Sequence, residues 1–188
     1  MTRLHKVVYV VCRPKSLVGD KSSIVKMYTA DTLSPLGEDI HIEGMRDPGD
    51  IVHDRDDRQL YVSDWNDNCI WRVSVDDHSY VRWLPTESTT DTFIVCSLSL
   101  RSRRLLVTTR RCTLHQYNTT DRQLLRIVQM PEYVELLYHG VETTRGTFVV
   151  SHQRLSDEQY AVSELFNFCL HRVPKLATPL ASNTLNSV

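Results

Sequence analysis

The sequence predicts an all-β protein, built as a propeller-like array of four-stranded blades that forms an incomplete ring. Three observations lead to this prediction. Two apolar strand motifs recur along the chain with a spacing of about 45 residues, β-branched and aromatic residues dominate these runs, and turn-forming residues separate them. Four short strands in about 40–45 residues are what one propeller blade requires.

The first motif is an apolar strand that runs into a polar turn containing aspartate. Its copies begin at Val25, Ile70 and Leu114, which are 45 and 44 residues apart. A weaker copy begins at Val162, 48 residues after the third. Because each copy joins an alternating apolar strand to turn residues, it indicates one strand of each blade.

The second motif is an apolar triplet that follows a polar turn and has the composition of a buried strand. It occurs at Leu60–Val62, Leu105–Val107 and Thr147–Val149, with middle residues 45 and 42 positions apart. Val8–Val10 is its first member, set further back by an insertion around residues 14–22. Two independent motifs with one period indicate a true repeat.

The two motifs divide the segment 5–173 into four blades, followed by a tail at 174–188 that is rich in Ser, Thr and Asn and is expected to be disordered. Four blades would leave an unpaired edge at each end, and such edges invite pairing. The chain could therefore be a fragment, or a piece that associates to complete its ring. The expected blades are residues 5–46, 47–90, 91–133 and 134–173.

One part of the chain resembles a known family. The segments Asp47–Val52, Gln59–Trp65 and Asn68–Val73 resemble a blade of the NHL-repeat propellers, and the related YWTD propellers of cell-surface receptors share much of this outline. The resemblance is good over residues 47–75, whereas the segments 6–46 and 91–152 match only at the level of strands. It implies a propeller, and NHL propellers usually close with six blades.

The composition is that of an ordinary globular protein, with 41% hydrophobic and 24% charged residues. A formal net charge of −1 predicts no strong attraction to nucleic acid or to an acidic membrane. No apolar run approaches the ~20 residues that span a bilayer, and the N-terminal run is too short for the core of a signal peptide. A cytoplasmic location without a membrane partner is the default expectation, and an extracellular one applies if the chain is a fragment.

The sequence contains no motif that identifies an enzyme. Phosphate-binding glycine loops, nucleophile elbows and zinc-binding helix motifs are missing, and the five cysteines form no C-x-x-C pair. No metal site and no cofactor are therefore predicted, and Asp50, Asp64 and Glu142 are expected to cap turns. The first hypothesis is a non-catalytic module that binds or scaffolds protein partners. The alternative is a propeller hydrolase or lyase around His139 and His152, which flank one strand.

Arginine supplies 17 of the 22 basic residues, and a cluster of arginines is the strongest candidate for a binding surface. Two successive turns of the third unit carry it, so some of its members are expected to share a rim. Because certain NHL propellers bind single-stranded RNA on a basic face, the resemblance gives RNA binding as another alternative, with a tryptophan available for stacking. The candidate binding residues are Arg101, Arg103, Arg104, Arg110, Arg111 and Trp65.

Overall fold

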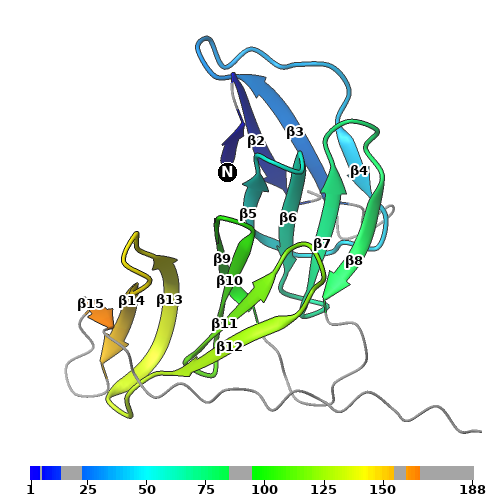
Figure 1. The fold of residues 1–188 in the computed structure, drawn as a ribbon. Helices are drawn as coiled ribbons and strands as arrows, with labels where there is room; N and C mark the ends of the chain where they lie inside the picture. Colours follow the sequence, from blue (N-terminus) through cyan, green and yellow to red (C-terminus); the bar gives the residue numbers. More distant parts are fainter. Residues whose placement is uncertain (5, 14–22, 85–94, 155–159, 166–188) are drawn as a thin grey trace, which may run out of the picture.

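A computed structural model describes residues 1–4, 6–13, 23–84, 95–154 and 160–165 of the chain. These residues form fifteen β-strands in four antiparallel sheets and contain no helix (Figure 1). The predicted class, an all-β array of blade-like sheets, is confirmed. The part of the expected fourth unit after residue 165 and the expected tail at 174–188 lie outside the described residues.

Each sheet is a meander in which strands that follow one another in sequence lie side by side. The first sheet contains β1 (Thr2–Leu4), β2 (Val7–Cys12), β3 (Ser23–Thr29) and β4 (Ile40–Ile42). The second contains β5 (Pro48–Asp54), β6 (Gln59–Asp64), β7 (Cys69–Ser74) and β8 (Tyr80–Leu84). The third contains β9 (Val95–Arg101), β10 (Arg104–Thr109), β11 (Thr113–Asn118) and β12 (Leu124–Gln129). The fourth contains β13 (Val134–Glu142), β14 (Phe148–Arg154) and β15 (Tyr160–Leu165).

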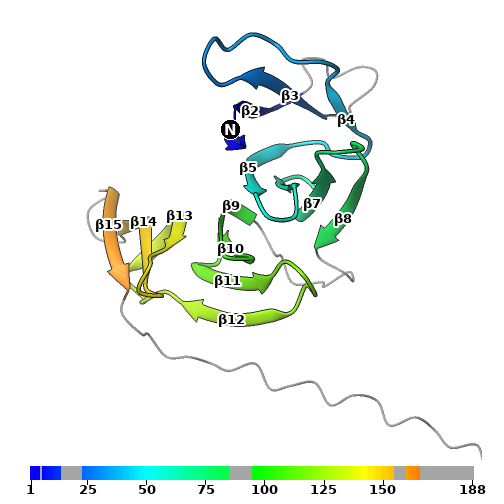
Figure 2. The ribbon, with the colours of Figure 1, turned by 45° about the horizontal axis from the view of Figure 1, so that its top comes forward.

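The sheets follow one another around an arc, and the first and fourth sheets lie at its two ends (Figure 2). The first strand of each sheet is the innermost: β5 contacts β1 on one side and β9 on the other, and β9 contacts β13. Each sheet has two ends. We call the end with the turns between first and second strands and between third and fourth strands the hairpin end. The opposite end, where the chain passes from one sheet to the next, is the connection end.

The hydrophobic core consists of three clusters, one at each interface between successive sheets. Val25 and Leu60 belong to the cluster of the first interface, Tyr61 and Leu105 to that of the second, and Leu106 to that of the third. The first two clusters join the second to fourth strands of one sheet to the first three strands of the next, whereas the third joins β10–β12 to β13 and β14. The stability of every sheet therefore depends on its neighbours, as in other repeat proteins.

The second strand of each sheet shows why the repeat motif is apolar on both faces. In β6 and β10 the last five residues are buried, including residues that point to opposite sides of the sheet. A strand between two packed faces needs a nearly continuous apolar run. The equivalent strands β2 and β14 belong to the terminal sheets, and residues of only one face pack into the clusters.

A buried carboxylate fixes the connection between the first and second sheets. Asp64 is fully buried at the end of β6. Its Oδ2 accepts a hydrogen bond from the backbone N–H of Arg46 at 2.9 Å, and its Oδ1 accepts one from that of Asp47 at 3.1 Å. Its Oδ1 also accepts the N–H groups of Asn66 and Asp67 in the following turn. The expected role of Asp64 in turn capping is thus seen in its contacts.

No helix able to cross a bilayer occurs in the part of the chain that the structure describes.

Candidate functional site

The structure places the arginines of the third sheet at opposite ends of β10. Arg101, Arg103 and Arg104 lie at the β9–β10 turn, which belongs to the hairpin end. Arg110 and Arg111 lie in the β10–β11 turn, at the connection end. A strand of six residues separates the two groups by roughly 20 Å. The five arginines therefore form no single basic surface.

The arginines of the hairpin end join neighbouring sheets to each other. Arg103 Nη2 lies 3.0 Å from Asp57 Oδ1 of the second sheet, and Arg104 Nε lies 3.1 Å from Glu142 Oε2 of the fourth. Arg101 Nη1 donates to the backbone carbonyl of Glu142 at 3.4 Å. Each of these guanidinium groups thus has a partner within the fold, and this use competes with binding to an external phosphate.

Glu142 is the centre of a polar network between the third and fourth sheets. Its side chain is only 4% exposed, and it accepts hydrogen bonds from Gln116 Nε2 at 2.8 Å and from Arg126 Nη2 at 3.3 Å in addition to Arg104. Arg126 also donates to Gln116 Oε1 at 2.8 Å and stacks on the ring of Phe148. The network replaces apolar contact at the hairpin end of this interface.

Trp65 lies in the β6–β7 turn at the connection end and is 38% exposed. The guanidinium of Arg13 lies 5.4 Å from the centre of its ring, and Arg13 Nε pairs with Asp47 at 2.7 Å. The indole ring also contacts Gly49 so closely that a Cβ atom on Gly49 would overlap it. Trp65 thus lies at the connection end of the second sheet, whereas Arg101, Arg103 and Arg104 lie at the hairpin end of the third.

Replacing Gly49 by alanine should displace Trp65 and lower the free energy of unfolding by about 1–3 kcal/mol, because the added methyl group overlaps the indole ring. Gly49 is not among the glycines with positive φ, so its backbone suits alanine. In a Trp65→Ala background the same change should cost nothing, or stabilise by about 0.5 kcal/mol through a less flexible unfolded chain. Urea unfolding of the wild-type chain, the two single variants and the double variant measures this. Equal losses in both backgrounds would contradict the contact.

The two histidines of the enzyme hypothesis do not meet. His152 in β14 is buried, and its Nε2 lies 2.9 Å from Ser163 Oγ. His139 in β13 is exposed and pairs with Ser151, the neighbour of His152 in β14. Adjacent residues of a strand point to opposite faces of the sheet, so the histidines lie on opposite faces. Among the described residues there is also no group of three or more side chains able to hold a metal ion.

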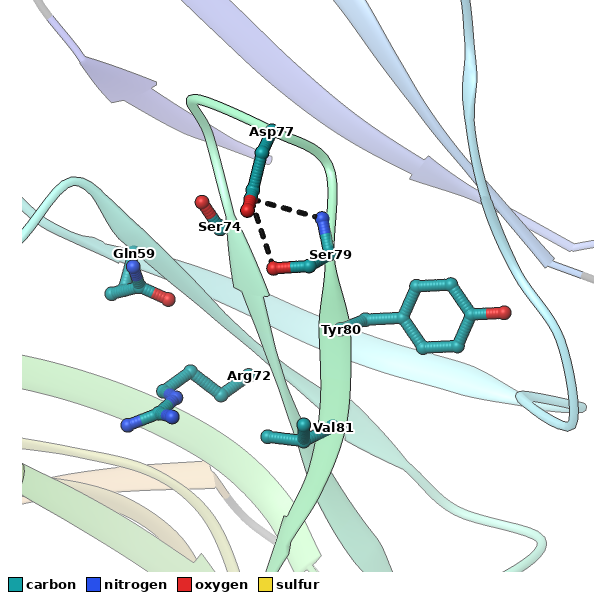
Figure 3. A pocket seen from close by; sticks show the side chains of 7 residues that line it. All are labelled: Gln59, Arg72, Ser74, Asp77, Ser79, Tyr80 and Val81. Carbon is teal, nitrogen blue, oxygen red and sulfur yellow. Dashed lines mark hydrogen bonds between the residues drawn. The ribbon is translucent and has the colours of Figure 1, made fainter.

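A polar pocket of about 250 Å³ lies on one face of the second sheet, near the hairpin end. It opens on the face that carries Tyr61 and Ile70, which pack against the third sheet. In Figure 3 the side chains of Gln59, Arg72 and Val81 extend to one side of the strands, whereas the Tyr80 ring points away. The strand register explains this. Arg72 pairs with Tyr61 on one side and with Val81 on the other, and residues that pair directly point to the same face of the sheet. The pocket is lined by Gln59, Arg72, Ser74, Asp77, Ser79, Tyr80 and Val81.

Two opposite charges define the chemistry of this pocket. The hydroxyl groups of Ser74 and Ser79, together with the Ser79 N–H at 3.1 Å, lower the pKa of Asp77 to about 2, so its carboxylate remains ionised at neutral pH. Arg72 supplies the positive charge, and within the described residues it forms no ion pair. The Gln59 amide can both donate and accept. The pocket thus suits a polar group that brings a carboxylate to Arg72 and hydrogen-bond donors to Asp77.

This pocket was not among the sites predicted from the sequence. Its signal was the alternation within β7, where Arg72 and Ser74 follow Ile70 on one face while Trp71 and Val73 occupy the other. Two polar residues on a face that begins with a buried isoleucine indicate that apolar packing stops there. That pattern marks the end of the apolar packing on this face, but it does not distinguish a pocket from a solvated edge.

No model of a protein family matches the chain, and a search of curated protein sequences found no match. Solved structures with a similar fold exist. A computationally designed protein, Ika4, has a TM-score of 0.58 with 10% sequence identity, and the match covers 88% of each chain. Hydrazine synthase of Kuenenia stuttgartiensis has a TM-score of 0.55 with 12% identity, over 78% of this chain and 43% of that one. At these identities the likeness concerns the fold alone, and this chain spans less than half of the hydrazine synthase chain.

Proposed function

We propose that the chain is a non-catalytic, propeller-like binding module that holds a protein partner at the Arg72 pocket. A carboxylate of the partner would bind the guanidinium of Arg72, which suits two parallel hydrogen bonds to such a group. The observation that carries the proposal is an arginine in a polar pocket, fixed on the middle of a strand and without an ion pair among the described residues. The resemblance to NHL propellers agrees with a binding role.

The alternatives receive less support from the geometry. RNA binding requires a continuous basic surface, whereas the candidate arginines lie at two ends of the third sheet and several of them bond to neighbouring sheets. A hydrolase or lyase centred on the two histidines requires them to converge on one substrate, whereas they lie on opposite faces of the fourth sheet.

Short fluorescent peptides with blocked ends, sorted into acidic, neutral and basic sets, test this proposal by fluorescence polarisation. Acidic peptides should bind best, and Arg72→Gln should weaken them about tenfold, since one charge-assisted pair is worth about 1.5–3 kcal/mol. Arg72→Lys should retain part of the affinity, because lysine keeps the charge without the planar fork. Arg145→Gln, at an exposed turn of the fourth sheet, is the matched control. Binding that Arg72→Gln leaves unchanged, or no preference for acidic peptides, would refute the proposal.

A further inference from the structure

The two terminal sheets carry apolar residues on faces that nothing in the described chain covers fully. In β2, Tyr9 packs into the first core cluster, whereas Val10 points to the other side and is half-buried. In β14, Phe148 and Val150 belong to the third cluster, whereas Val149 between them is half-buried. The sequences of β2 and β14 are thus those of strands buried on both faces, like β6 and β10, but the described residues cover the second face only in part, burying Val8 and leaving Val10 and Val149 half-buried.

The fourth sheet carries much of the exposed apolar surface of the described chain. Val162 in β15 is 72% exposed and Val141 in β13 is 39% exposed. Leu136 and Tyr138 of β13 are also exposed, and Tyr138 donates a hydrogen bond to Gln153 at 2.9 Å. Large exposed apolar surfaces mark sites of interaction. We call the side of the fourth sheet that bears Val141, Val149 and Val162 the trailing face.

The three internal interfaces show what kind of surface fits the trailing face. In each one, the second to fourth strands of a sheet pack against the first strands of the next, which are the first three strands at two interfaces and the first two at the third. The trailing face presents β14 and β15, which are the second and third strands of its sheet. The matching surface is therefore formed by the first two or three strands of another sheet, on the side that does not face a following sheet.

The first sheet has this surface, and we call it the leading face. It lies opposite the side that packs on the second sheet, and it carries Val8 and Val10 of β2 with Ile24, Lys26 and Tyr28 of β3. The trailing and leading faces are thus the two halves of a fourth interface of the same type. They lie at opposite ends of the arc (Figure 2).

We propose that a second copy of this chain is the partner of these faces, with the trailing face of one copy packed on the leading face of the other. A second copy offers both required surfaces, and the contact continues the interface type that the chain already uses three times. Two copies related by a two-fold axis are the smallest assembly in which every terminal face is covered. Association would also protect the apolar faces that the open arc leaves exposed.

Sedimentation velocity of the full chain, from about 1 to 100 μM, should show particles of twice the chain mass of 21.8 kDa. Val162→Glu places a charge on the trailing face and should weaken association at least tenfold. Val10→Glu does the same on the leading face, and Lys26→Glu replaces it if Val10→Glu fails to fold. Leu125→Glu is the matched control, because Leu125 is 39% exposed on β12 and belongs to neither face. Thermal melts verify that each variant is folded.

Mixing distinguishes head-to-tail pairing from every other mode. Val162→Glu and Val10→Glu should each be monomeric alone, yet together they should form a mixed dimer, because one of its two interfaces contains only unaltered faces. A wild-type chain that remains monomeric at 100 μM overturns the proposal, as does a dimer that Val10→Glu and Lys26→Glu both leave intact. If removal of residues 166–188 converts a monomer into a dimer, the trailing face belongs to that segment, and the proposal is also overturned.

Discussion

Asp64→Ala is expected to lower the free energy of unfolding by about 4 kcal/mol, which corresponds to a melting temperature about 10 °C lower for a chain of this size. The carboxylate is fully buried and accepts four backbone N–H groups, two from the connection between sheets and two from its own turn. Alanine leaves these donors without an acceptor, and a hydrogen bond to a charged group contributes about 1.5–3 kcal/mol. Urea unfolding followed by far-UV circular dichroism measures the loss.

Asp64→Asn should cause about half of this loss. Its remaining oxygen can replace Oδ1, which accepts three of the four hydrogen bonds, whereas an amide NH₂ replaces Oδ2 and opposes the N–H of Arg46. Asp121→Ala is the control. Asp121 accepts a hydrogen bond from the Gln123 N–H at 2.9 Å in an exposed turn, so its loss should stay within about 1 kcal/mol. Equal losses for Asp64→Ala and Asp121→Ala would show that Asp64 does not fix the connection.

Glu142→Ala is expected to lower the free energy of unfolding by about 3 kcal/mol and to loosen the fourth sheet selectively. The substitution leaves Arg126 and the buried Gln116 amide without their acceptor at the third interface, together with the more exposed Arg104. Removing one partner from a buried ion pair typically costs about 3–5 kcal/mol, and the partial exposure of the arginines places this case at the lower end. Hydrogen exchange should accelerate in β13 and β14 and remain unchanged in β5–β7.

Glu135→Ala, on an exposed position of the same strand, is the matched control and should change the free energy of unfolding by less than about 0.5 kcal/mol. Hydrogen exchange that accelerates equally in all four sheets would contradict a local role of Glu142. It would mean that the sheets unfold as one unit rather than through their separate interfaces.

The strands could be predicted from the sequence because the repeated apolar residues are the ones that the strands bury. The triplets at Leu60–Val62 and Leu105–Val107 lie in β6 and β10, and the motif copies at Val25 and Ile70 lie in β3 and β7. A strand enclosed on both faces needs apolar side chains on both, so its position is visible without knowledge of its neighbours. The spacing of such strands then indicates the unit, and the unit indicates the array.

The roles of the charged residues could not be predicted in this way. Proximity in sequence suggested that Arg104 and Arg110 share a surface, although the strand between them carries the two residues to opposite ends of the sheet. The partners of Arg103 and Arg104 are Asp57 and Glu142, which lie 46 and 38 residues away in sequence on other sheets. Such pairs depend on how neighbouring sheets pack, and no local pattern encodes that packing.

The pocket was missed for a related reason. Arg72 belongs to the segment that resembles an NHL blade, where it fills an unspecified position of the motif. Its significance depends on Gln59 and Val81, which are brought to its side by hairpin pairing. A repeat motif consists of the residues that a strand buries in the core, whereas this pocket is lined by residues that lie outside the core.

The repeated interface also bears on how such a chain changes during evolution. Because the second to fourth strands of one sheet meet the first two or three strands of the next at all three interfaces, one unit can be duplicated or deleted without a new kind of surface. The length of the chain can then change in steps of about 45 residues while the remaining units keep their packing. Selection on such a chain acts separately on the number of its units and on the loops that connect their strands.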